Sequence, residues 1–86
     1  MEILIKVNDY NAQSGLKLNW TGNYKIIATN NNGELVISAN EDGLLSLASH
    51  FLTLAQSNVP VGTHIHLDEY NSLEEGSAEL VIQKID

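Results

Sequence analysis

A single long helix is the feature that most constrains the fold of this chain. From Asn40 to Asn58, apolar side chains recur at steps of three and four residues, which is typical of an amphipathic helix. Asn40 is a suitable N-cap, and Pro60 closes the segment. The stripe expected to face the core consists of Leu44, Leu47, Ala48, Phe51 and Ala55, widened by Leu45 and Leu52.

Segments that alternate between apolar and polar residues lie on both sides of this helix. They predict strands over residues 2–7, 16–20, 24–31 and 34–40 before it, and over residues 63–68 and 78–85 after it. The order β-β-β-β-α-β-β predicts one α+β domain spanning residues 1–86. We expect a mainly antiparallel sheet of about six strands, with one helix packed on one of its faces.

Two turns set the expected register of the sheet. Asn32-Gly33 is a strong hairpin signal, and it predicts the opposed pairs Ile26 and Ala39, Ala28 and Ile37, and Asn30 and Leu35. The face carrying Ile26, Ala28, Leu35, Ile37 and Ala39 is expected to lie under the helix. A three-residue loop over residues 21–23 would pair Trp20 with Tyr24, with Gly22 or Asn23 left-handed.

The charge balance excludes several classes of function. Four lysines stand against eleven acids, the net charge is −7, and the chain has no arginine. Nucleic-acid binding needs a basic stripe to neutralise phosphates, so we expect no nucleic-acid partner and no binding to anionic membranes. A surface with this excess of acids favours a basic partner, or serves solubility alone.

The N-terminus and the residue composition narrow the setting and the chemistry. The first residues are not typical of a signal peptide, and no apolar run is long enough for a membrane span, so we expect a cytoplasmic protein. The absence of cysteine excludes disulfides and thiolate zinc sites. No serine lies in a glycine elbow, so we predict no enzymatic activity and no cofactor. His50, at the edge of the helix stripe, is interpreted as a packed or boundary histidine.

One strand carries the only pattern typical of a metal site. His64, His66 and Asp68 occupy alternate positions, so their side chains leave from one face, and this donor set suits zinc or iron. The alternative is that Ile65 and Leu67 face the core and the polar residues simply occupy the solvent-exposed face of the strand. No second element offers a further ligand, so we predict no metal.

The segment that follows is the candidate for partner binding. Five acids, Asp68, Glu69, Glu74, Glu75 and Glu79, lie within twelve residues without a basic residue among them. Tyr70 lies between them, and tyrosine is enriched at binding hot spots. We therefore predict a docking surface for a basic protein formed by Asp68, Glu69, Tyr70, Glu74 and Glu75. The alternative is a solvated loop with Leu73 tucked into the core.

Several segments also resemble a known family. They are Gly43 to Ala48, Leu54-Ala55-Gln56, Val59-Pro60, and above all His64 to Ser77 together with Glu79 to Ile82. They are similar to small immunity proteins of bacterial polymorphic and contact-dependent toxin systems, over about residues 34–84.

The resemblance implies a non-enzymatic cytoplasmic protein that binds and blocks one cognate toxin domain. Many such toxins are basic nucleases, so an acidic surface that covers the active site is the expected mode of neutralisation. We expect a monomer or a weak homodimer. The alternatives are a small metal-binding domain using His64, His66 and Asp68, or a homo-oligomeric interaction module.

Overall fold

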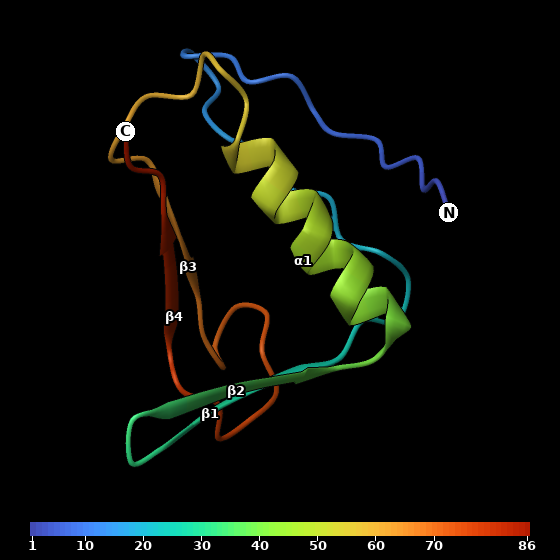
Figure 1. Ribbon diagram of the computed structural model, residues 1–86, viewed down its shortest axis with the longest axis vertical. Coiled ribbons are helices and arrows are strands. Elements are labelled where there is room, and N and C mark those ends of the chain that lie inside the picture. The colour runs from blue at the N-terminus through green and yellow to red at the C-terminus, as the bar shows by residue number, and fades with distance from the viewer.

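The computed structural model describes residues 1–86 and places one helix beside two β-hairpins (Figure 1). Strand β1 (Ile26–Asn31) pairs antiparallel with β2 (Glu34–Ala39), helix α1 (Glu41–Leu54) follows, and β3 (His64–Leu67) pairs antiparallel with β4 (Leu80–Gln83). The α+β class is confirmed. The single sheet of about six strands was wrong, because the four strands form two separate two-stranded sheets.

The N-terminal quarter does not form the two strands predicted over residues 2–7 and 16–20. Asparagine side chains take the place of a backbone ladder between these segments. The amide of Asn8 donates to the carbonyl of Lys17 (3.0 Å), and the amide of Asn19 donates to a carbonyl of the first segment (3.2 Å). Because side-chain amides bond these carbonyls, the two segments lie together without backbone pairing. A segment without backbone pairing is not a strand, whatever its propensity.

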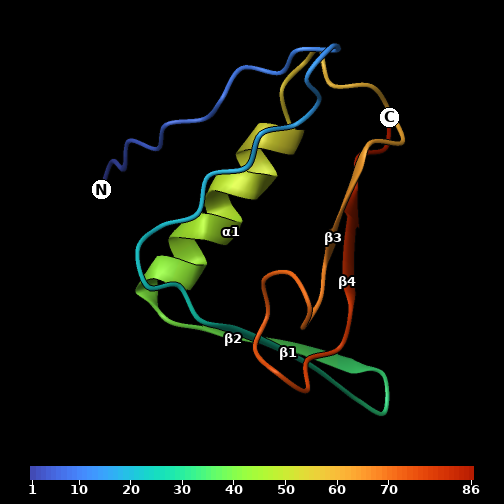
Figure 2. The ribbon, with the colours of Figure 1, turned by 180° about the vertical axis from the view of Figure 1, so that it is seen from behind.

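The chain before β1 runs alongside α1 instead (Figure 2). The backbone N–H of Thr21 donates to Ser46 Oγ of the helix at 2.8 Å. Trp20 and Tyr24 stack with their ring centroids 4.5 Å apart, and Gly22 is left-handed with φ +43°. The left-handed turn is therefore confirmed and the two rings meet, but the strand pairing predicted around them does not form.

The β1–β2 hairpin has the predicted register. Ile26 lies opposite Ala39 and Ala28 opposite Ile37, and Asn32 and Gly33 both have positive φ, as a type I′ turn requires. Ile26 and Ala28 are buried, but the hairpin tip extends beyond the helix. Leu35 and Ile37 on the same face are consequently exposed. The prediction that the helix covers this whole face was wrong at the β2 end.

Helix α1 begins as predicted and ends early. The Asn40 side chain accepts a hydrogen bond from the backbone N–H of Gly43 at 2.8 Å, which confirms the N-cap. The last helical residue is Leu54 and Ala55 is the C-cap, so the predicted end at Asn58 was wrong. The helix lacks the length and hydropathy that crossing a membrane would require.

The buried face of α1 differs from the predicted stripe. Small and polar residues face the core, whereas Leu44, Phe51 and Leu52 are about half exposed. Small side chains let the helix approach its neighbours closely. Two of the buried hydroxyls bond the helix backbone, since Ser46 Oγ donates to the carbonyl of Asp42 (2.8 Å) and Thr53 Oγ1 to the carbonyl of Ser49 (2.7 Å), whereas Ser49 Oγ has no partner in the protein. The buried residues are Gly43, Ser46, Leu47, Ser49, His50, Thr53 and Leu54.

The apolar core lies between α1 and the two hairpins. It consists of eight buried residues: Ile26, Ala28, Leu47, Leu54, Val59, Ile65, Leu67 and Leu73. His50 is 0% exposed beside this core, its ring meets Trp20 edge-on at 4.3 Å, and neither ring nitrogen has a hydrogen-bond partner in the protein. The interpretation of His50 as a packed histidine is confirmed. Desolvation by burial lowers its pKa below the ordinary 6.5.

This buried histidine predicts a specific loss of stability in mild acid. The unfolded chain binds a proton at His50 near pH 6.5 and the folded chain binds it only at lower pH, so stability falls as the pH drops below about 6.5. His50→Leu, which removes two unpartnered nitrogens, should raise the free energy of unfolding by about 1 kcal/mol at pH 7. Urea denaturation at pH 7 and pH 5 should show the variant's advantage growing in acid. His64→Gln, a change at an exposed histidine, serves as the control and should show no such growth.

Candidate functional site

The acidic segment predicted to bind a partner forms an ordered loop between β3 and β4. At its start, Asp68 Oδ1 accepts hydrogen bonds from the backbone N–H of Tyr70 (2.9 Å) and of Asn71 (3.1 Å). The carbonyl of Asp68 accepts from the N–H of Leu73 at 2.9 Å. Leu73 is buried and belongs to the core. The loop therefore has a fixed first turn and an apolar anchor.

The second half of the loop is attached to the free edge of β1. The N–H of Glu74 donates to the carbonyl of Ile26 (2.9 Å), and the N–H of Ala78 donates to the carbonyl of Ala28 (2.8 Å). Glu69 Oε2 accepts from the N–H of Gly76 at 2.8 Å across the loop. These bonds hold the loop against the hairpin, so its side chains are presented from a rigid frame.

The five predicted binding residues share this loop but differ in availability. The carboxylates of Asp68 and Glu69 bond loop backbone and are half buried. Tyr70 is 89% exposed, Glu75 is exposed, and Glu74 is half buried with no hydrogen bond to its carboxylate. Tyr70, Glu74 and Glu75 are thus the residues most able to contact a partner, whereas Asp68 and Glu69 shape the loop. Their role in binding stays a prediction.

The His-x-His-x-Asp pattern does not assemble a metal site. His64 and His66 are exposed on the outer face of β3, with ring centroids 4.9 Å apart, and His66 Nδ1 lies 3.5 Å from Glu79 Oε1. Asp68 lies beyond the end of β3 and its carboxylate turns back into the loop. No three side chains among His, Cys, Asp and Glu are grouped as metal ligands. The metal-binding alternative therefore loses its third ligand.

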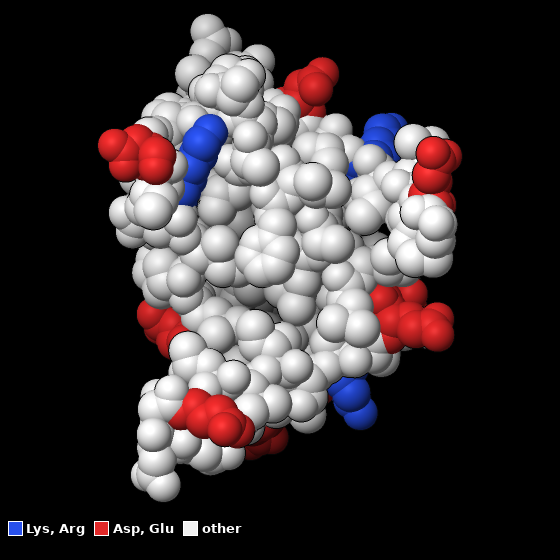
Figure 3. Space-filling model, viewed as in Figure 1, with Lys and Arg blue, Asp and Glu red and all other residues white.

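The negative charge of the molecule is almost wholly uncompensated. The one ion pair joins His66 to Glu79, both exposed. The ammonium of Lys84 donates instead to the carbonyls of Gln56 (2.7 Å) and Val59 (2.8 Å), just beyond α1. In the view of Figure 3, charged side chains lie around the edge of the molecule and the centre carries none. None of the acids is therefore paired with a lysine.

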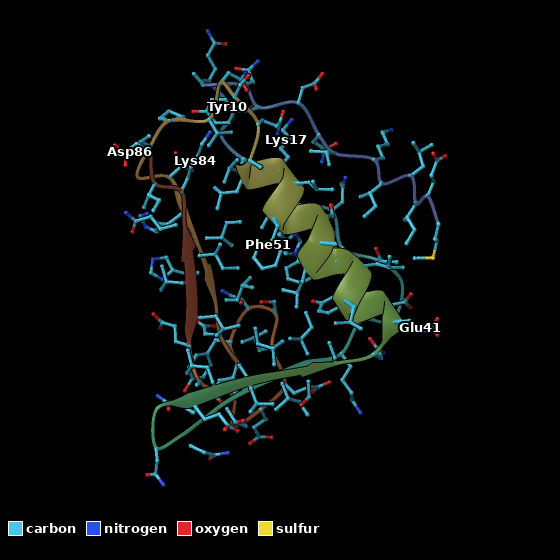
Figure 4. All side chains as sticks on the ribbon, in the orientation of Figure 1. Tyr10, Lys17, Glu41, Phe51, Lys84 and Asp86 are labelled. Atoms are coloured by element: carbon cyan, nitrogen blue, oxygen red, sulfur yellow. The ribbon has the colours of Figure 1, made fainter.

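The uncharged centre of this face is a feature that the sequence prediction missed. Phe51 lies there, between α1 and the β3–β4 hairpin (Figure 4), and is 49% exposed although it was expected in the core. A signal was present in the sequence, because no Lys, Arg, Asp or Glu occurs between Asp42 and Asp68. A surface helix normally carries charges on its outer side.

Comparison with protein families supports the resemblance seen in the sequence. The model of the family described as Immunity protein 32 matches residues 34–85, which include β2, α1, β3, β4 and the acidic loop. No match was found among curated proteins or among solved structures. Because the matched residues make up more than half of the chain, the chain belongs to the immunity protein 32 family.

Proposed function

We propose that this protein binds and neutralises one cognate bacterial toxin domain, a basic nuclease, in the cytoplasm, and performs no reaction of its own. Membership of the immunity protein family supports the class of function. The observation that carries the mode of binding is the rigid acidic loop with its free carboxylates and exposed tyrosine. An acidic surface of this kind complements the phosphate-binding cleft of a nuclease, and its field steers the encounter.

The direct experiment mixes the purified protein with the toxin domain encoded beside its gene. We expect a 1:1 complex and loss of nuclease activity at equal concentrations of the two proteins. Calorimetry and a nuclease assay read out the two effects separately. The absence of a complex at micromolar concentrations would reject the proposed function.

Charge reversal in the loop tests the acidic surface itself. Glu74→Lys combined with Glu75→Lys should slow association about tenfold at low salt, because electrostatic steering raises association rates by one to several orders of magnitude. The dependence of the association rate on ionic strength should flatten, since screening acts on that same field. Stopped-flow fluorescence at several salt concentrations measures both changes.

The matched control reverses two acids remote from the loop. Glu2→Lys with Asp9→Lys changes the net charge by the same amount in the N-terminal segment, which runs apart from the acidic loop (Figure 1). If the control pair slows association as much as the loop pair, the effect belongs to net charge and the loop is not the binding surface. Unchanged kinetics in the loop variant would also place the epitope elsewhere.

A further inference from the structure

The outer side of α1 is apolar and largely exposed to solvent. Leu44 is 55% exposed, Phe51 is 49% exposed and Leu52 is 49% exposed. Leu44, Phe51 and Ala55 lie seven and four residues apart, so together with the half-buried Ala48 they line one side of the helix over about 16 Å. We call Leu44, Ala48, Phe51, Leu52 and Ala55 the α1 outer face.

A pocket adjoins Phe51 at the C-terminal end of the helix. It has a volume of about 200 Å³ and is lined by Phe51, Leu54, Ala55 and Lys84. Because the ammonium of Lys84 is held by two carbonyls, the side chain offers mainly its aliphatic stem to this pocket. The α1 outer face therefore combines an aromatic side chain with an apolar recess, which is the arrangement of an interface hot spot.

Charges surround this face without entering it. Phe51 occupies the uncharged centre of the view, whereas Glu41 lies at one edge and Asp86 at another (Figures 3 and 4). Protein interfaces commonly have an apolar core within a polar rim. A monomer rarely exposes an extended apolar patch of this kind unless it serves an interaction.

The sign of the rim discriminates between two possible occupants. In a two-fold dimer the same patch meets itself, so two rims that carry some lysines but more acids (Figure 3) would face each other across the contact. With a net charge of −7 on each copy, that arrangement is repulsive. A basic protein carrying an apolar protrusion matches both the centre and the rim.

We propose that the α1 outer face is a docking surface for the basic toxin domain, with Phe51 as its apolar anchor. This inference rests on the proposed function and adds a binding residue to it. The acidic loop lies behind β2 in Figure 1 and in front in Figure 2, whereas Phe51 faces the viewer of Figure 1. The toxin domain therefore either reaches around the hairpin to the loop or uses the loop only during the encounter.

The test compares two exposed aromatic residues, one on each surface. Phe51→Ala should raise the Kd for the toxin domain encoded beside the gene at least tenfold, mainly through faster dissociation. Leu44→Ala, at the other end of the face, should raise it severalfold. Tyr70→Ala reports on the acidic loop. Circular dichroism and the melting temperature of each variant show whether it remains folded. If Phe51→Ala does not fold, Leu44→Ala still tests the α1 outer face.

The outcomes separate this inference from the proposed function. Loss of affinity in the Phe51 and Leu44 variants supports the α1 outer face, with or without a loss in Tyr70→Ala. Full affinity in both of these variants overturns the inference, while binding by the wild type preserves the proposed function. No binding by the wild type rejects the proposed function itself. A wild-type dimer in sedimentation that becomes monomeric with Phe51→Ala would assign the face to a second copy and overturn the inference.

Discussion

Gly43→Ala is expected to destabilise the protein by about 2 kcal/mol, although alanine is the better helix former. Gly43 has ordinary helical φ and is buried in the first turn of α1, so propensity alone predicts a gain of about 1 kcal/mol. A Cβ at this position would lie 2.6 Å from the carbonyl oxygen of Lys25 and 3.0 Å from Ile26 Cγ1. The helix must then move away from β1, and because the closest atom is a backbone oxygen we expect a cost near the upper end of the usual range of about 1–3 kcal/mol for overpacking. After the gain in propensity, a net loss of about 2 kcal/mol remains.

The sign of the stability change in Gly43→Ala shows whether helix propensity or steric overlap with Lys25 and Ile26 dominates. Urea denaturation should show a lower midpoint with an unchanged slope, and the melting temperature should fall by about 10 °C. Gly15→Ala provides the comparison, because Gly15 has open space around it but a positive φ of 74°. It should lose about 1 kcal/mol from backbone conformation alone. A Gly43→Ala protein as stable as the wild type would mean that the helix and β1 are not in close contact.

Features of the fold with local causes were predicted correctly, whereas the buried face of α1 was not. The N-cap at Asn40 and the Asn32-Gly33 hairpin were predicted correctly because their causes are local. The buried face of α1 was predicted wrongly because the periodicity argument weighted large apolar residues such as Phe51. The buried face instead carries Gly43 and two serines as well as Leu47 and Leu54, and the close contact at Gly43 leaves no room for a side chain at that position.

Contacts between residues far apart in the sequence account for the other differences between the predicted and the observed strands. The segment 16–20 has the alternation of a strand, but whether it becomes one depends on a pairing edge. In the structure Asn8 donates to the Lys17 carbonyl of this segment, and Asn19 of this segment donates to the carbonyl of Lys6, and no periodicity reveals these contacts. The division of the four strands into two separate sheets could not be predicted either, because the sequence indicates where strands occur and not which strands pair.

The candidate site was predictable in location but not in detail. Clustered acids and a tyrosine indicated an acidic loop, and residues 68–79 do form a loop between β3 and β4, although Asp68, Glu69 and Glu74 are half buried. The clustering of acids did not reveal that the carboxylates of Asp68 and Glu69 hold the loop together by accepting hydrogen bonds from its own backbone N–H groups. It also hid the α1 outer face, because an apolar stripe on one helix does not say whether the core or a partner covers it.

Asn40→Ala is expected to destabilise the protein by about 2 kcal/mol, because this side chain joins three segments. Its Oδ1 accepts from the N–H of Gly43 (2.8 Å) and of Lys25 (3.0 Å), and its Nδ2 donates to the carbonyl of Asn23 (2.9 Å). Loss of an N-cap costs about 1 kcal/mol, and each further hydrogen bond contributes about 0.5–1.5 kcal/mol, toward the lower end at an exposed position such as this. Chemical denaturation should show the change.

Asn40→Ser separates the cap from the other two bonds. Serine is as good an N-cap as asparagine and can accept from Gly43, but it is too short to reach Lys25 and Asn23 as well. We therefore expect the serine variant to recover about half of the stability lost in the alanine variant. Equal loss in both variants would show that the bonds to Lys25 and Asn23 are dominant, and full recovery by serine would show that the cap alone matters. The start of α1 is also held to the chain before β1 by Ser46 and Asp42, whose side chains accept from the N–H groups of Thr21 (2.8 Å) and Asn23 (3.0 Å), so the helix and the hairpin should keep their relation in both variants.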